Sequence, residues 1–162
     1  MRTCPPSRSL TITFRIPHAI TIESSISGES TKVFVDTSAW FASVVPDDPD
    51  HAAAIKWLRE NERLLITTDY VVDEILTLLR ARGQNRRAAA LGSRLFEGAV
   101  ADIHYLTQAD IAETWATFVR FADKEWSFTD CSSRVVIASR RIYTAFALDH
   151  HFEQFGNVIV VP

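Results

Sequence analysis

Short apolar segments of strand length alternate with longer amphipathic segments of helical period from Lys32 to the C-terminus. Strands that are separated by helices cannot close hairpins, so they pair in parallel, and the helices cover both faces of the sheet. This alternation predicts an α/β fold. We expect one three-layer α/β/α domain with a central, mostly parallel sheet of about five strands.

Five short segments of strand length, most of them apolar, are predicted to be strands. They lie at 32–35, 64–67, 102–106, 144–148 and 158–160. Between them, helices are expected over about 38–44, 50–60, 69–82, 85–97, 107–121 and 129–141. Thr107 and Asp110 form a capping-box pattern, and Gly83 is a stop signal for the third helix. Either Thr129 or Ser127 is expected to cap the last helix.

Residues 1–30 differ from the rest of the chain in composition. They are rich in Ser, Thr and Ile, and three prolines interrupt any helix. A secretory signal would need an apolar stretch of about 7–15 residues, and none occurs there. We expect a disordered leader or an over-extended gene start, which leaves residues 31–162 as the functional domain.

Composition argues against several classes of protein. No uninterrupted apolar run exceeds four residues, so we expect no membrane-spanning helix. The two cysteines, Cys4 and Cys131, lie far apart, and free thiols in a reducing cytoplasm are the simplest interpretation. The formal charge of −3 argues against a strongly basic nucleic-acid-binding protein.

Acidic residues directly follow two of the predicted strands. Asp36 comes after 32–35, and Asp149 comes after 144–148. The carboxyl ends of parallel strands share one edge of the sheet, which is where α/β proteins bind their ligands. Asp130 lies at the start of the helix that precedes the strand at 144–148. Because this helix and this strand are similar in length and run in opposite directions, we expect Asp130 to lie at the same edge as Asp149.

A fourth acid comes from the helix that follows the second strand. Glu74 lies at the margin of the apolar stripe of this helix, whereas Asp73 lies on its polar face, so we choose Glu74. Taken one at a time, these acids also fit ordinary strand ends, helix surfaces, helix caps or turns. The four together point to one site.

Four carboxylates at a half-buried edge repel one another, by on the order of 4 kcal/mol for a pair about 4 Å apart at an effective dielectric constant of about 20. Protons, a nearby cation or a metal ion must neutralise them. An oxygen-rich ligand set suits Mg²⁺ or Mn²⁺. Zinc would require His or Cys ligands, and we expect none in a suitable position, although His150 and His151 are adjacent.

Four segments surround the proposed acids. They are V-F-V-D-T-S-A at Asp36, V-V-D-E-I-L-T-L-L at Glu74, F-T-D-C-S-S at Asp130 and A-F-A-L-D-H-H-F at Asp149. In their order and spacing, from about residue 32 to 162, these segments resemble the motifs of PIN-domain nucleases. Among PIN domains, they are most similar to the toxins of VapBC-type toxin–antitoxin pairs.

The resemblance implies a PIN-like fold and a metal-dependent endoribonuclease that acts on RNA, forms a homodimer and is held inactive by a cognate antitoxin. By motif match, the catalytic and metal-binding acids are Asp36, Glu74, Asp130 and Asp149. One or two Mg²⁺ or Mn²⁺ ions would bind the scissile phosphate and activate a water molecule. Ser38 and Thr129 would be supporting hydroxyl contacts; a first-turn residue and a helix cap are their simpler interpretations.

Five arginines occur between residues 80 and 94, a stretch without any acidic residue. They are Arg80, Arg82, Arg86, Arg87 and Arg94. Because this cluster begins less than two helical turns after Glu74, we expect it to bind the RNA backbone, so a mildly acidic total charge does not exclude RNA. A solvated corner between two helices is the alternative.

One position departs from the family pattern. Arg134 lies one helical turn after Asp130, where relatives usually carry an apolar or aromatic residue. It could pair with Asp130, contact a substrate phosphate or point to solvent. If it occupied the metal position, the protein would be a catalytically weak or inactive PIN-like domain that binds RNA or a protein partner, which is the alternative function.

Two other families place acids at the edge of a parallel sheet. A signalling receiver domain needs a lysine near its last strand, and no lysine follows Lys124. A haloacid-dehalogenase-like phosphatase has a second acid two residues after the first, and Ser38 stands at that position. Both patterns are therefore incomplete in this chain.

Overall fold

A computed structural model of the protein describes residues 31–162; the leader expected over 1–30, with Cys4, lies outside the described residues. The elements in chain order are β1 (Lys32–Val35), α1 (Thr37–Val44), α2 (His51–Glu60), β2 (Leu64–Thr68), α3 (Asp69–Ala81), α4 (Asn85–Phe96), β3 (Asp102–His104), α5 (Gln108–Arg120), α6 (Phe128–Ser139), β4 (Thr144–Phe146), the 3₁₀ helix η1 (His150–Phe155) and β5 (Ile159–Val161). The predicted order is confirmed, and η1 is an addition. Cys131 is a buried free thiol. Within 31–162, no helix has the length and apolar composition that a membrane span requires.

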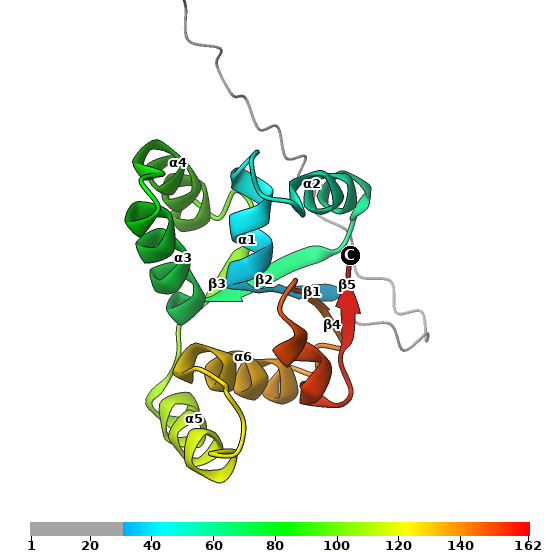
Figure 1. The fold of residues 1–162 in the computed structure, drawn as a ribbon. Helices are drawn as coiled ribbons and strands as arrows, with labels where there is room; N and C mark the ends of the chain where they lie inside the picture. The colour runs from blue at the N-terminus through cyan, green and yellow to red at the C-terminus, as the bar shows by residue number, and fades with distance from the viewer. Residues whose placement is uncertain (1–30) are drawn as a thin grey trace, which may run out of the picture.

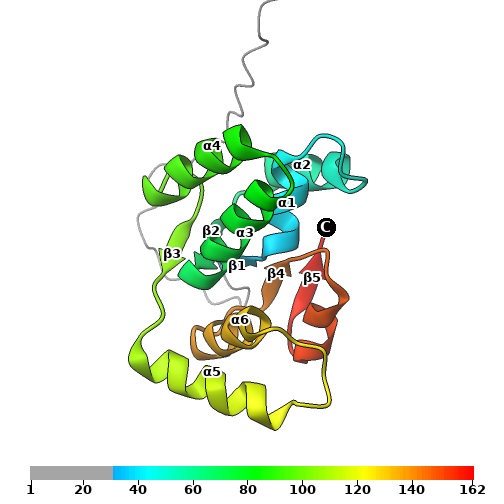
Figure 2. The same ribbon diagram turned by 60° about the vertical axis from the view of Figure 1, so that its left-hand side comes forward.

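All five strands form one parallel sheet in the order β3-β2-β1-β4-β5. β1 lies at the centre, where Phe34 is in register with Ile66 of β2 and with Ala145 of β4. Helices α1 to α4 cover one face of the sheet, and α5 and α6 lie on the other, with η1 beside α6 (Figures 1 and 2). The predicted three-layer α/β/α architecture is confirmed.

The chain reverses its direction of travel across the sheet at β1. After β1 it moves outward to β2 and β3, and it then returns to place β4 on the other side of β1. At such a switch point the neighbouring connections diverge and leave a crevice at the carboxyl ends of the strands. The end of β1 therefore lies where α/β folds bind their ligands.

The central strand is buried on both faces, as expected of a parallel sheet between two helical layers. Residues 33–35 have no exposed surface. Phe34 stacks on Phe152 of η1 with ring centroids 6.1 Å apart, and Trp57 of α2 packs on Phe146 of β4 at 4.4 Å. Burying one such side chain contributes about 1.5–3 kcal/mol, so these contacts anchor η1 and α2 to the central strands.

Most helix ends follow the predicted signals. Thr107 and Asp110 form the predicted capping box of α5, and Gly83 adopts φ +72° just after α3. The residue that caps α6 is Ser127, whose hydroxyl accepts a hydrogen bond from the backbone of Asp130. Thr129 lies inside the first turn of α6 instead. β3 and β4 each end two residues earlier than predicted.

Candidate metal centre

Asp36 ends β1 and caps α1. Its backbone N–H donates to the carbonyl of Phe146 at 3.0 Å, which extends the pairing of β1 with β4. Its side-chain Oδ2 accepts hydrogen bonds from the N–H of Ser38 at 3.0 Å and from Ser38 Oγ at 2.6 Å. The Ser38 hydroxyl also accepts from the N–H of Leu148 at 3.0 Å. Ser38 therefore orients the Asp36 carboxylate and ties it to the segment after β4.

The Asp36 side chain is buried, and its acidity changes accordingly. Burial raises the pKa of Asp36 from 3.8 to about 6, the hydrogen bonds from Ser38 oppose this rise, and the negative charge of Asp130 adds to it. A strongly perturbed pKa at a crevice is typical of a functional site. A cation nearby would favour the ionised form and release the proton.

Glu74 lies in the second turn of α3, half-buried, and contacts the start of α1. Thr37 Oγ1 donates to Glu74 Oε2 at 2.5 Å. Burial raises the pKa of Glu74, the hydrogen bond from Thr37 opposes this, and the charges of Asp130 and Asp149 add to the rise. Asp73, which we rejected, is exposed. Thr37 was not among the predicted site residues, although it stands in the first motif.

Asp130 lies in the first turn of α6 and completes a capping box with Ser127. Its Oδ2 accepts from the N–H of Ser127 at 2.7 Å, and its own N–H donates to Ser127 Oγ at 3.0 Å. The capping role weighed for this acid is therefore present. The capping box uses only Oδ2 of Asp130. Oδ1 of Asp130 accepts no hydrogen bond from the residues that the structure describes.

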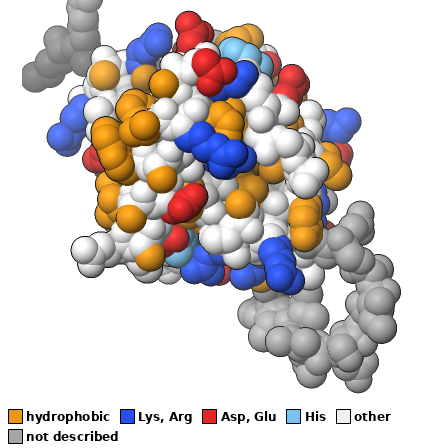
Figure 3. All heavy atoms as spheres, turned by 90° about the horizontal axis from the view of Figure 1, so that it is seen from below, with side chains coloured by type: hydrophobic (Ala, Val, Ile, Leu, Met, Phe, Trp, Pro, Cys, Tyr) orange, Lys and Arg blue, Asp and Glu red, His pale blue; other side chains and the backbone are white. Residues whose placement is uncertain are grey.

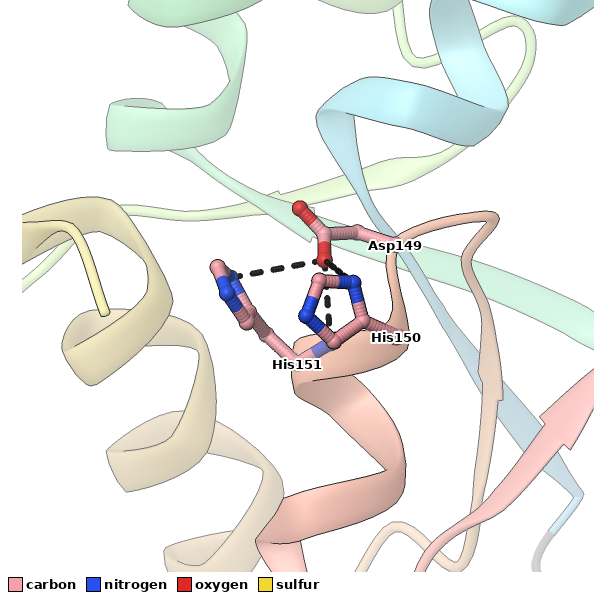
Figure 4. Close-up of side chains that lie close together, drawn as sticks. All are labelled: Asp149, His150 and His151. Carbon is pink, nitrogen blue, oxygen red and sulfur yellow. Dashed lines mark hydrogen bonds and ion pairs between the residues drawn. The ribbon is translucent and has the colours of Figure 1, made fainter. Parts of the chain in front are cut away.

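Asp149 follows β4 and caps η1, and two imidazoles lie beside it (Figure 4). Its Oδ1 accepts from the N–H of His151 at 2.9 Å, and Nδ1 of His150 and Nδ1 of His151 each lie 3.4 Å from that oxygen. The three residues offer ligand atoms within 4.8 Å of one another. The expectation that no histidine is suitably placed to ligate zinc is therefore wrong. The physical reason is the 3₁₀ helix η1, which we did not predict. Its tight first turn places the imidazole rings of His150 and His151 next to the carboxylate of Asp149, the N-cap of η1.

The four acids come together at the switch point, from the end of β1, from α3, from the start of α6 and from the segment after β4. The charge of Asp130 acts on both Asp36 and Glu74, and that of Asp149 acts on Glu74. Nδ1 of His151 lies 3.7 Å from Asp130 and 3.4 Å from Asp149. Partly buried carboxylates that repel one another form a ligand set that fits a hard divalent cation.

The PIN domain family model matches residues 33–158. The chain belongs to the PIN domain family. The 23S rRNA-specific endonuclease VapC20 of Mycobacterium tuberculosis is 35% identical over 132 residues, which cover 80% of this PIN domain protein and 98% of VapC20. The ribonuclease VapC26 of the same organism is 26% identical over 137 residues, which cover 80% of this chain and 100% of VapC26.

Solved structures show the same fold. The crystal structure of M. tuberculosis VapC20, described as a sarcin–ricin loop cleaving toxin, has a TM-score of 0.75 and 30% identity, over 80% of this chain and 99% of that chain. FitAcB of Neisseria gonorrhoeae has a TM-score of 0.57 at 15% identity. VapBC2 of Rickettsia felis, bound to a promoter DNA fragment, has a TM-score of 0.58 at 9% identity. Both of these cover 80% of this chain and 96% of the other.

Arg134, the position that we expect to depart from the family pattern, packs on aromatic rings. Its guanidinium carbon lies 4.9 Å from the ring centroid of Phe121 and 5.9 Å from that of Trp126. Within residues 31–162 it forms no ion pair with an acid. None of the three roles considered for Arg134 included this contact, which holds its charge against the α5–α6 connection.

The two predicted hydroxyl residues differ in their surroundings. Ser38 donates its hydroxyl to Asp36 at 2.6 Å and so makes the kind of hydroxyl contact expected of it. The side chain of Thr129 makes no hydrogen bond to a described residue, and its carbonyl accepts from Ser132 Oγ at 2.8 Å. Ser38 is therefore built into the site, whereas Thr129 only lies near it in the chain.

The five arginines lie on α3, on α4 and on the turn between them. Arg80, Arg82 and Arg86 are exposed, and Arg87 is partly buried. Because α3 leads away from the carboxyl edge, Arg82 lies about 12 Å along the helix axis from Glu74. The cluster is therefore a basic surface that neighbours the acidic site and is not part of it.

Replacing Asp36 by Asn should remove the pH dependence of stability that this buried carboxyl gives the metal-free PIN domain. A carboxyl whose pKa rises from 3.8 to about 6 on folding stabilises the folded state below pH 4, and this contribution is lost as the pH rises through 6. The difference in unfolding free energy, Asp36→Asn minus wild type, should grow by about 1–3 kcal/mol from pH 4 to pH 8. Urea unfolding in the presence of a chelator at each pH measures this difference.

Asp47→Asn, at an exposed position, is the control. A difference between Asp36→Asn and wild type that does not change with pH would contradict the raised pKa of Asp36.

Proposed function

We propose that this PIN domain protein is an endoribonuclease that cleaves RNA phosphodiester bonds with the aid of divalent metal ions. One observation carries the proposal: four carboxylates from four separate elements converge at the switch point of the sheet. They are Asp36, Glu74, Asp130 and Asp149. The similarity over most of its length to VapC20, an endonuclease, supports the same activity.

The four carboxylates are the proposed metal ligands, and Mg²⁺ or Mn²⁺ is the proposed ion. Carboxylate oxygens suit both ions, and the burial that raises the pKa of Asp36 makes a cation the natural neutralising group at pH 7. When bound, one or two such ions would supply phosphate binding, a more acidic water and charge stabilisation at the leaving oxygen.

The residues of the chain would hold and orient the reacting groups. Ser38 fixes the carboxylate of Asp36, and Thr37 fixes that of Glu74. A carboxylate held in this way can accept the proton of the attacking water. We further propose that the arginines of this basic surface bind phosphates that flank the cleaved bond. Arg80 lies nearest the site along α3, followed by the exposed Arg82 and Arg86 and the partly buried Arg87.

We also propose that the protein is the toxin of a VapBC-type pair, acts in the cytoplasm and is held inactive by a cognate antitoxin. The support is its 30% identity and TM-score of 0.75 to VapC20, which is described as a toxin. The name of VapC20 states that it is specific for 23S rRNA, so 23S rRNA is the first substrate to test.

A homodimer is proposed through the outer face of α5. Four large apolar side chains on this helix are exposed: Ile111, Trp115, Phe118 and Val119. Trp115 stacks on Phe118, and Phe118 packs edge-on against Phe128 of α6, so the patch is an ordered aromatic surface. Figure 3 shows hydrophobic side chains gathered on the face of the molecule that carries α5 and α6. Such a patch favours a protein interface.

Cleavage of RNA should depend on Glu74 and not on the acid beside it. Glu74→Gln keeps the side-chain shape but removes a charged ligand, so the rate should fall at least about 100-fold. Asp73→Asn removes an exposed charge and should change the rate by no more than about twofold. The assay is cleavage of 23S rRNA by purified protein with Mg²⁺ or Mn²⁺. Full wild-type activity in excess chelator, or equal loss in both variants, would contradict the proposal.

Trp115→Asp should separate the proposed dimer without unfolding either subunit. The side chain is 59% exposed, so the substitution costs little folding energy but puts a charge into the apolar patch. Light scattering coupled to size exclusion should give twice the 18.2 kDa chain mass for wild type and the single mass for the variant. Glu113→Gln, exposed elsewhere on α5, should remain dimeric. A monomeric wild type would refute the dimer.

A further inference from the structure

His151 lies between two of the four carboxylates, and its ring nitrogen lacks a hydrogen-bond partner. Nδ1 is 3.7 Å from Asp130 Oδ2 and 3.4 Å from Asp149 Oδ1. The side chain is 15% exposed, and Nδ1 is buried without a hydrogen bond to any residue that the structure describes. Leaving a buried polar atom unsatisfied costs about 1–3 kcal/mol, so this nitrogen points to a group that completes it.

The two distances are too long for a direct bond between the ring and the carboxylates. A charge-assisted hydrogen bond from an imidazolium to a carboxylate spans about 2.7–2.9 Å. Two ligand atoms on one metal ion, each about 2.1 Å from it, lie about 3.0–3.4 Å apart in octahedral or tetrahedral geometry. Small movements would therefore let Nδ1 and the two carboxylates hold one ion between them.

The ligand set also fits a cation by charge and by chemistry. Asp130 and Asp149 both raise the pKa of Glu74, so the edge of the site carries excess negative charge. A divalent ion offsets two carboxylates, and a neutral imidazole adds a ligand without adding charge. Imidazole nitrogen suits transition-metal ions, whereas Mg²⁺ prefers oxygen.

We infer that His151 Nδ1 ligates a divalent ion together with the carboxylates of Asp130 and Asp149. This inference rests on the proposed function for the presence of a metal ion. It goes further by assigning a nitrogen ligand and, with it, a preference for Mn²⁺ or another first-row transition ion over Mg²⁺. His150 shares Asp149 Oδ1 but is 74% exposed, so it is not required for binding.

The nitrogen ligand can be observed directly with Mn²⁺ as the probe. Full-length protein is stripped of metal, loaded with Mn²⁺ and examined by electron spin-echo envelope modulation. Wild type should show coupling of the Mn²⁺ spin to an imidazole ¹⁴N, and ¹⁵N-histidine labelling should change that signal. The coupling should be lost in His151→Gln and kept in His150→Gln. In His151→Gln the Mn²⁺ dissociation constant should rise at least about tenfold, and the Mg²⁺ constant should change far less.

The outcomes separate this inference from the proposed function. Mn²⁺ bound without nitrogen coupling in wild type would overturn the His151 assignment and leave metal-dependent cleavage standing. Coupling that is lost in His150→Gln but kept in His151→Gln would show that His150, and not His151, supplies the nitrogen ligand. No Mn²⁺ binding at all would overturn both proposals. The wild-type spectrum needs no variant, so the test holds even if His151→Gln folds poorly, which a thermal unfolding curve would reveal.

Discussion

The carboxylate of Asp36 is buried because it ends the central strand of the sheet, and the rest of the site depends on that burial. Water cannot stabilise its charge there, so its pKa rises to about 6. Three further acids reach the same edge from α3, from α6 and from the segment after β4. The charge of Asp130 raises the pKa of both Asp36 and Glu74, and that of Asp149 raises the pKa of Glu74. At neutral pH, the cation that we propose for this site would offset the repulsion among the four carboxylates.

Short hydrogen bonds hold these repelling carboxylates in place. Ser38 donates to Asp36, and Thr37 donates to Glu74. The acids that also cap helices are Asp36, Asp130 and Asp149. Capping brings the positive ends of α1, α6 and η1 toward the acids, which offsets part of their charge. Local stability and the candidate site are therefore built from the same residues, and amide substitutions, which keep the acceptor oxygen, separate the two better than alanine does.

The sheet and the acidic edge could be predicted because parallel topology alone brings Asp36 and Asp149 to one side. The position of His151 could not be predicted, because a short 3₁₀ helix leaves no periodic pattern in the sequence. In addition, Asp130, which lies near His151, belongs to another element. The contact of Arg134 with aromatic rings depends on how the α5–α6 connection folds back, which helical spacing does not reveal. Contacts between elements were thus the part that required the structure.

The metal centre is tested most directly by anomalous diffraction from crystals of the wild-type protein soaked in Mn²⁺. A peak is expected at the carboxyl edge of the sheet, within about 2.0–2.3 Å of oxygens from at least two of the four acids. Those acids are Asp36, Glu74, Asp130 and Asp149. A crystal with Mn²⁺ bound only at exposed acids elsewhere, or with none at this edge, would contradict the metal centre and the function proposed from it.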